Sequence, residues 1–219
     1  MQLNYPTDTL NTLLSRWQKT LQTFAVDKLA AEQAFVKLVA AYSTPERHYH
    51  TLQHVEHVLN TVDVLQGYTR NLSAVQLAAW FHDVVYDNQA EDNEEKSADY
   101  ACELLSDLSL PQSAIATITR LILDTKHHQA TVNDEDTYVL LDADLAILAA
   151  NPGQYKEYTD SIRQEYAWVS EADYIQSRTQ FLKKLLQRRY IYFTPLMWEF
   201  AEPAARANLQ HEIQNLVYN

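Results

Sequence analysis

Residues 77–86 read LAAWFHDVVY, and their apolar side chains are the main guide to the fold. Apolar residues at helical spacing lead into this stretch, so we expect a buried helix. His82 and Asp83 interrupt the apolar run. An ionised carboxylate is costly to remove from water unless it is paired, so a metal ion or a dense hydrogen-bond network is expected beside this doublet.

The same three- and four-residue spacing of apolar residues recurs along most of the chain, without sustained alternation of period two. We therefore expect an all-α protein, a single-domain helical bundle of about eight to ten helices. Ser73 and Gln76 form a capping-box pattern that would open the helix of the doublet. Later helices are expected at about residues 93–107, 112–127, 134–149, 154–168, 171–190 and 202–217.

The chain length fits one domain better than two, because 219 residues can bury a single sizeable core. We expect this domain to span residues 1–219. Its central part, at about residues 45–150, would carry the polar site, and the helices of residues 152–219 would pack on it.

More histidines and aspartates lie on either side of the doublet. His50, His54 and His57 precede it, and Asp142 and Asp144 follow it inside an apolar segment. On a helix Asp142 and Asp144 diverge by roughly 200°, so only one of them normally faces a bound ion.

Two imidazoles and two carboxylates form a donor set for one divalent ion: Mn, Fe, Co, Ni, Zn or, less well, Mg. Consecutive helical residues point about 100° apart, so His82 and Asp83 converge only at a bend or on an ion between their directions. The candidate ligands are therefore the doublet with one of the upstream histidines and one of Asp142 and Asp144.

The order His54, then His82 and Asp83, then Asp144 resembles the HD superfamily of metal-dependent phosphohydrolases, which is named for the His-Asp doublet. The resemblance implies that these four residues are the metal ligands. Residues 47–55, RHYHTLQHV, are similar to a Tyr-His-Asn-x-x-His stretch of related cyclic-nucleotide phosphodiesterases. Residues 123–128, LDTKHH, resemble a Thr-x-x-His segment common in HD hydrolases. Tyr166, residues 192–194 and residues 202–209 resemble the uncharacterised predicted HD phosphohydrolases, so the resemblance covers most of the chain and implies an HD-type helical fold.

The resemblance also implies roles for individual residues. The family's last ligand precedes a leucine, which selects Asp144 and leaves Asp142 near the site or facing solvent. His50 matches the proton donor to the leaving oxygen, a role suited to an imidazole. Thr51 replaces the usual asparagine beside it, so a structural hydrogen bond of His50 is the alternative. Asp83 would bind the ion and orient the attacking water.

The expected substrate contacts are His128, Arg47 and Asp87. Adjacent histidines diverge, so at most one of His127 and His128 faces the site, and the resemblance points to His128. Cationic residues at a helix end also interact favourably with its dipole, which is the structural alternative. Arg47 could grip a phosphate or simply pair with a carboxylate. We expect one ion, with a second conceivable through Asp83, His127 or His128.

The implied function is metal-dependent hydrolysis of a phosphate ester or anhydride in a small nucleotide or other phosphorylated metabolite. Two alternatives stay open: a metal-stabilised nucleotide sensor without turnover, and a di-iron oxygenase. Two glycines in 219 residues are too few for a glycine-rich phosphate loop, so dinucleotide and phosphate-loop folds are excluded.

Charge and composition limit the partners and the compartment. The chain has 17 Lys and Arg against 29 Asp and Glu, a net charge of -12 without a basic stripe, which argues against nucleic-acid polymers and anionic membranes. A small anion could still bind, because the local charge of a metal outweighs distant carboxylates. One cysteine excludes an internal disulfide, and neither a signal peptide nor an apolar membrane-length run is evident. We expect a soluble, cytoplasmic protein.

Overall fold

The helix that leads to the His-Asp doublet is α4 (Leu72–Phe81), and all of its residues from Leu77 onward are buried. Asn71 caps it, because its side chain accepts a hydrogen bond from the amide of Ala74 at 3.1 Å. The capping box predicted at Ser73 is therefore wrong, and Ser73 lies within the first turn. The helix ends at Phe81, so the doublet sits at the bend that two diverging side chains require to meet.

The computed structural model describes residues 5–130 and 133–218. Within these ranges the chain forms eleven α-helices and two short 3-10 helices without a strand, which confirms the all-α prediction. Around α4 lie the helices α1 (Thr7–Gln22), α2 (Lys28–Ala41), α3 (Leu52–Val64), α5 (Asn93–Asp107), α6 (Gln112–Thr125) and α7 (Glu135–Asp144), with the 3-10 turn η1 (Gln66–Tyr68).

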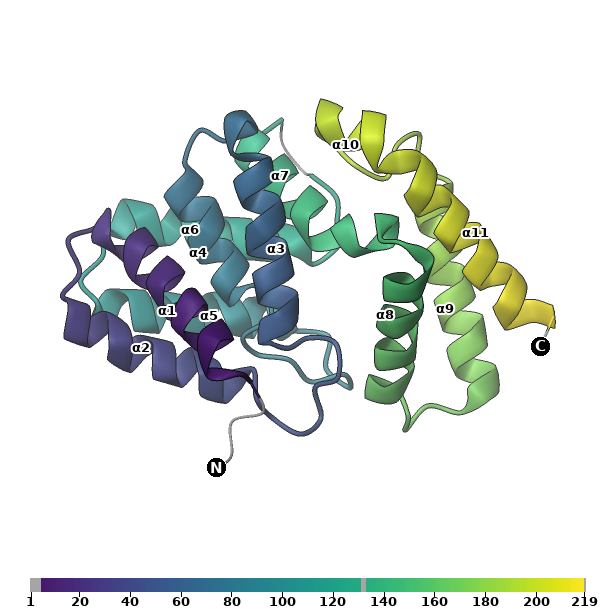
Figure 1. Ribbon diagram of the computed structural model, residues 1–219, viewed down its shortest axis with the longest axis horizontal. Coiled ribbons are helices and arrows are strands. Elements are labelled where there is room, and N and C mark those ends of the chain that lie inside the picture. Colours follow the sequence, from purple (N-terminus) through teal and green to yellow (C-terminus); the bar gives the residue numbers. More distant parts are fainter. Residues whose placement is uncertain (1–4, 131–132, 219) are drawn as a thin grey trace.

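The C-terminal part of the chain forms a second group of helices, shown on the right of Figure 1. A 3-10 helix joins it to α7, and α11 and α8 pack on this connection. The elements are η2 (Leu145–Ala149), α8 (Pro152–Glu165), α9 (Glu171–Leu186), α10 (Pro195–Phe200) and α11 (Glu202–Tyr218).

Two clusters of buried apolar side chains correspond to these two groups. The N-terminal cluster runs from Leu13 to Ala143, and the C-terminal cluster runs from Leu145 to Leu209. The aromatic rings of Trp17, Trp80 and Phe81 meet edge to face in the first cluster. Helical periodicity by itself does not distinguish one apolar core from two, because each helix has a buried face in either arrangement.

The ends of the helices differ from the sequence expectation in ways that matter for the site. The helix expected over 134–149 changes to a 3-10 helix after Asp144, and the helix expected over 154–168 ends at Glu165. Polar side chains therefore gather where helices begin or end, beside the junction of the two clusters. These side chains are His50, His82, Asp83, His128, Asp144 and Glu165.

None of the helices in residues 5–130 and 133–218 combines the length and the apolar character needed to cross a membrane.

Candidate metal centre

Three ligand groups from three helices converge at one point. His54 comes from α3, His82 follows α4, and Asp144 is the last residue of α7. His54 Nε2 lies 3.0 Å from His82 Nε2, and Asp144 Oδ1 lies 3.3 and 3.5 Å from these two nitrogens. Ligands about 2.1 Å from an ion lie about 3.0 Å apart in an octahedron and about 3.4 Å apart in a tetrahedron. The three groups could therefore hold one divalent ion.

Asp83 contacts the same cluster. Its Oδ2 lies 3.1 Å from His82 Nε2 and 3.5 Å from His54 Nε2. Asp142 lies elsewhere and is fully buried, so the solvent-facing alternative for it is wrong. Its carboxylate accepts hydrogen bonds from the amides of Phe193 and Thr194 at 2.7 Å, so it fixes the loop before α10.

The electrostatics of the cluster favour a positive charge at its centre. Burial lowers the pKa of His82, but the charges and hydrogen bonds of Asp83 and Asp144 raise it well above the ordinary value. Burial likewise raises the pKa of both aspartates, whereas the histidines hold it below the usual range. His82 Nδ1 donates to the carbonyl of Ala79 at 3.0 Å, which directs Nε2 into the cluster.

A divalent cation would supply this positive charge without a proton on either imidazole, so the donor set fits a metal. One feature departs from the usual metal-bound histidine, whose second nitrogen donates a hydrogen bond. The Nδ1 of His54 is buried and has no partner among the described residues.

His50 stands just ahead of α3, where Thr51 serves as the N-cap. Its Nδ1 lies 2.7 Å from Glu165 Oε2, and its Nε2 lies 4.0 Å from Asp83 Oδ2. The ring also stacks on Tyr86 with a centroid separation of 4.1 Å. The imidazole is thus held between a carboxylate and an aromatic ring, with its second nitrogen facing the metal cluster.

Glu165 is the functional residue that the sequence reasoning missed. Its Oε1 accepts hydrogen bonds from the amides of His48, Tyr49 and His50 at 2.8, 2.8 and 3.0 Å. Burial would raise its pKa, but the hydrogen bond and charge of His50, with the backbone amides, lower the pKa to about 2. The one available signal was its position before Tyr166, which the family resemblance included.

His128 faces the metal cluster, whereas His127 is exposed. The Nε2 of His128 lies 3.4 Å from Asp144 Oδ2, and its Nδ1 donates to the carbonyl of Thr125 at 2.6 Å. Its backbone has φ of 48°, a left-handed conformation that costs a residue with a Cβ about 1 to 2 kcal/mol. Arg188 stabilises it by donating to the carbonyl of His128 at 2.6 Å.

Arg47 and Asp87, the other expected substrate contacts, lie outside the cavity beside the cluster. Arg47 is buried, and its guanidinium donates to the carbonyls of His50, Asp83 and Val84 at 2.8, 2.7 and 2.9 Å. The carbonyls of Asp83 and Val84 follow the end of α4, and that of His50 precedes α3, so Arg47 braces the backbone of two segments instead of facing a phosphate. Asp87 is exposed and accepts from the amide of Gln89.

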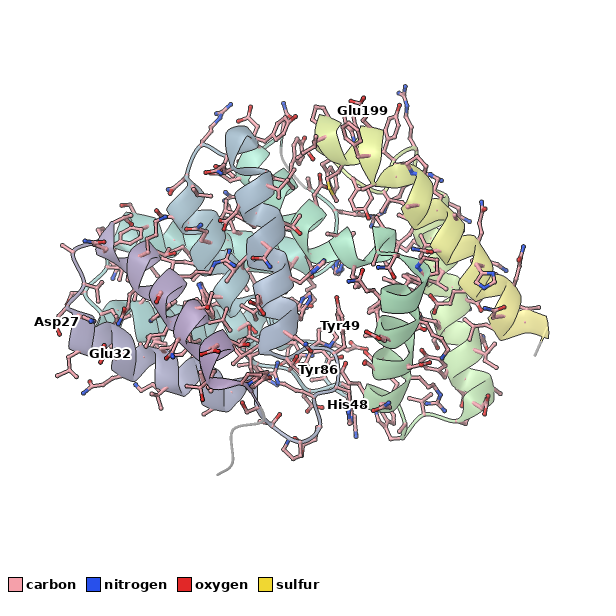
Figure 2. All side chains as sticks on the ribbon, in the orientation of Figure 1. Asp27, Glu32, His48, Tyr49, Tyr86 and Glu199 are labelled. Atoms are coloured by element: carbon pink, nitrogen blue, oxygen red, sulfur yellow. The ribbon has the colours of Figure 1, made fainter. Side chains whose placement is uncertain are left out.

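A cavity of about 370 Å³ opens beside the metal cluster, between the segment that precedes α3, the end of α4 and the C-terminal helices. His50, His82, Asp83, His128 and Asp144 line one end of it. Figure 2 shows Tyr49 and Tyr86 in this region, on the side of the N-terminal group that faces α8. Most of the expected catalytic and metal-binding side chains therefore share one hollow with room for a small molecule, whereas His54 lies outside its lining.

Comparisons of the chain with protein-family models, with curated proteins and with solved structures found no match. They neither support nor oppose the resemblance to the HD superfamily. The geometry of the metal cluster and of the cavity beside it is therefore the basis for assigning a function.

Proposed function

We propose that the chain is a metal-dependent phosphohydrolase that cleaves a phosphate ester or anhydride of a small metabolite in the cytoplasm, as its resemblance to the HD superfamily implies. The observation that carries the proposal is the convergence of His54, His82 and Asp144 beside a cavity, one end of which His82 and Asp144 line. Two further polar groups for proton transfer, Asp83 and His50, line the same end.

A divalent ion bound to this cluster would lower the pKa of a water molecule and stabilise negative charge on the phosphoryl oxygens. Asp83 would orient this water by accepting a hydrogen bond. With a proton on both ring nitrogens, His128 would donate from Nε2 to a phosphoryl oxygen while its Nδ1 donates to the carbonyl of Thr125.

The proposed reaction is a displacement at phosphorus. The oxygen of water forms a bond to phosphorus while the bond to the ester oxygen breaks. The departing oxygen takes a proton from His50 Nε2, and the proton released by the water passes to Asp83 or to solvent. Glu165 contacts His50 Nδ1 at 2.7 Å and so stabilises the imidazolium before the transfer.

The test combines metal analysis of the untreated protein with a turnover assay on nucleotides and phosphomonoesters. We expect metal-dependent release of phosphate that falls at least about 100-fold in Asp83→Ala, since removal of a positioned acid or base costs about that factor. Asp99→Ala is the matched control, because Asp99 is exposed on α5 and distant from the cavity lining.

Other outcomes would identify the alternatives. Thermal stabilisation by nucleotides without any turnover would favour a sensor. Two irons per chain with oxygen-dependent turnover would favour an oxygenase. Turnover that is unchanged in Asp83→Ala would contradict the proposed hydrolase.

A further inference from the structure

The cavity beside the metal cluster has two unlike ends. The metal-site end is built from histidines and aspartates, as described above. The remainder is mainly apolar, with Leu145, Ile147, Leu148 and Ile162 among its lining residues. Aromatic side chains also line this wall, namely Tyr49, Tyr86, Tyr158, Tyr166, Tyr174 and Phe181.

The cations of this wall are already used within the protein. Among the described lining residues Arg178 is the one lysine or arginine, and it is 8% exposed. Its Nε lies 2.7 Å from Glu212 Oε1, and its Nη2 donates to the hydroxyl of Tyr158 at 3.1 Å. Arg178 thus braces α8, α9 and α11 against one another. Glu94 adds a further carboxylate to the cavity lining.

This distribution of charge limits how many phosphate groups can bind. Two aspartates at the metal cluster would balance the charge of one divalent ion. A phosphate would then be attracted only by a bond to the ion and by the nearby histidines, which suffices for a single phosphate group. Additional phosphates would have to lie along a wall with no unpaired lysine or arginine and would meet Glu94. Proteins that bind polyphosphates normally supply several cationic or backbone donors for them.

We propose that the cavity selects phosphomonoesters with one phosphate at the metal-site end and an uncharged, flat or apolar body against the aromatic wall. This inference rests on the proposed hydrolase function and specifies its substrate class. The cavity volume of about 370 Å³ suits such a small molecule. Nucleoside di- and triphosphates are then poor substrates, whatever their base.

Two pairs of substrates test the two halves of the proposal. Benzyl phosphate and ethyl phosphate both release a primary alcohol, so they differ chiefly in the body that the wall would contact. We expect kcat/KM to be at least about tenfold higher for the benzyl ester, because the burial of its ring against aromatic side chains stabilises the bound substrate. Adenosine monophosphate and adenosine triphosphate share one body, and we expect turnover of the monophosphate to exceed that of the triphosphate by a similar factor.

A variant of the wall links the preference to the structure. Phe181 lines the cavity and is 38% exposed, so Phe181→Ala is expected to keep the fold. It should raise KM for benzyl phosphate roughly three- to tenfold and lower the preference for the benzyl over the ethyl ester by a similar factor, because it removes one aromatic contact. Phe200→Ala is the matched control, because Phe200 is 70% exposed on α10 and outside the cavity lining.

The possible results separate this inference from the proposed function. Equal kcat/KM for the benzyl and ethyl esters, or equal turnover of the mono- and triphosphate, would overturn the inference and leave the hydrolase intact. If no ester is turned over, calorimetric titration of the metal-loaded protein decides. Tighter binding of benzyl phosphate than of inorganic phosphate, reduced in Phe181→Ala, supports the aromatic wall, whereas equal affinity overturns it.

Discussion

Replacing Glu165 by glutamine tests whether this carboxylate holds the N-terminal loop and His50 in place. The side chain of Glu165 is fully buried, with 0% of its surface exposed. It accepts hydrogen bonds from three backbone amides, from His50 and from the hydroxyl of Tyr86. Glutamine has nearly the same shape and keeps one acceptor oxygen, but it loses the charge and presents an NH₂ group to His50.

The magnitude follows from the pKa. Burial would raise the pKa of Glu165, but His50 and the backbone amides lower it from the ordinary 4.5 to about 2. This difference corresponds to about 3 kcal/mol of stability. Because the pKa is depressed in the folded protein, the contribution is complete above about pH 4.5 and is lost as the pH falls towards 2. About half of it remains at pH 3.

The assay is urea denaturation of the wild type and of Glu165→Gln at several pH values between 7 and 3, analysed by linear extrapolation. We expect the variant to be about 2 to 3 kcal/mol less stable at pH 7, and this difference to shrink as the pH falls. Glu157→Gln is the control, because Glu157 is exposed on the same helix. A difference that stays constant with pH, or that is below about 0.5 kcal/mol at pH 7, would refute the reasoning.

Three further predictions follow from the same contacts. Asp144→Asn should weaken the affinity for a divalent ion at least about 100-fold in calorimetry. Asp142→Asn is the control, since it should lower stability and keep the affinity within about threefold. The reverse pattern would contradict the ligand assignment. Arg47→Met should cost about 3 kcal/mol in urea unfolding, because three buried carbonyls lose their donor, and a cost below about 1 kcal/mol would argue against the bracing role. Arg188→Met should speed amide hydrogen exchange at His128 about tenfold, since the left-handed backbone loses its carbonyl contact. Arg189→Met is the control, because Arg189 is its exposed neighbour. Equal exchange rates of the His128 amide in the two variants would contradict the prediction.

The spacing of apolar residues was enough to predict an all-α protein and most of its helices. α5 was predicted from Asn93 to Asp107, as the structure has it. The candidate ligands could also be named from the sequence, because a histidine or aspartate in an apolar segment needs a partner. Burial pointed to His82, Asp83 and one of Asp142 and Asp144, and the family resemblance selected His54 and Asp144. The structure brings the side chains of His54, His82, Asp83 and Asp144 together.

Tertiary structure alone decided what each neighbouring polar residue does. Glu165 lies 115 residues from His50 in the chain, and no local pattern links a glutamate at a helix end to an amide so far away. Arg47 was expected at a phosphate, but the helix ending at Phe81 leaves carbonyls nearby that its guanidinium satisfies. Helical periodicity records which face of each helix is buried, whereas the partner of a polar group depends on where the helices end and how they meet.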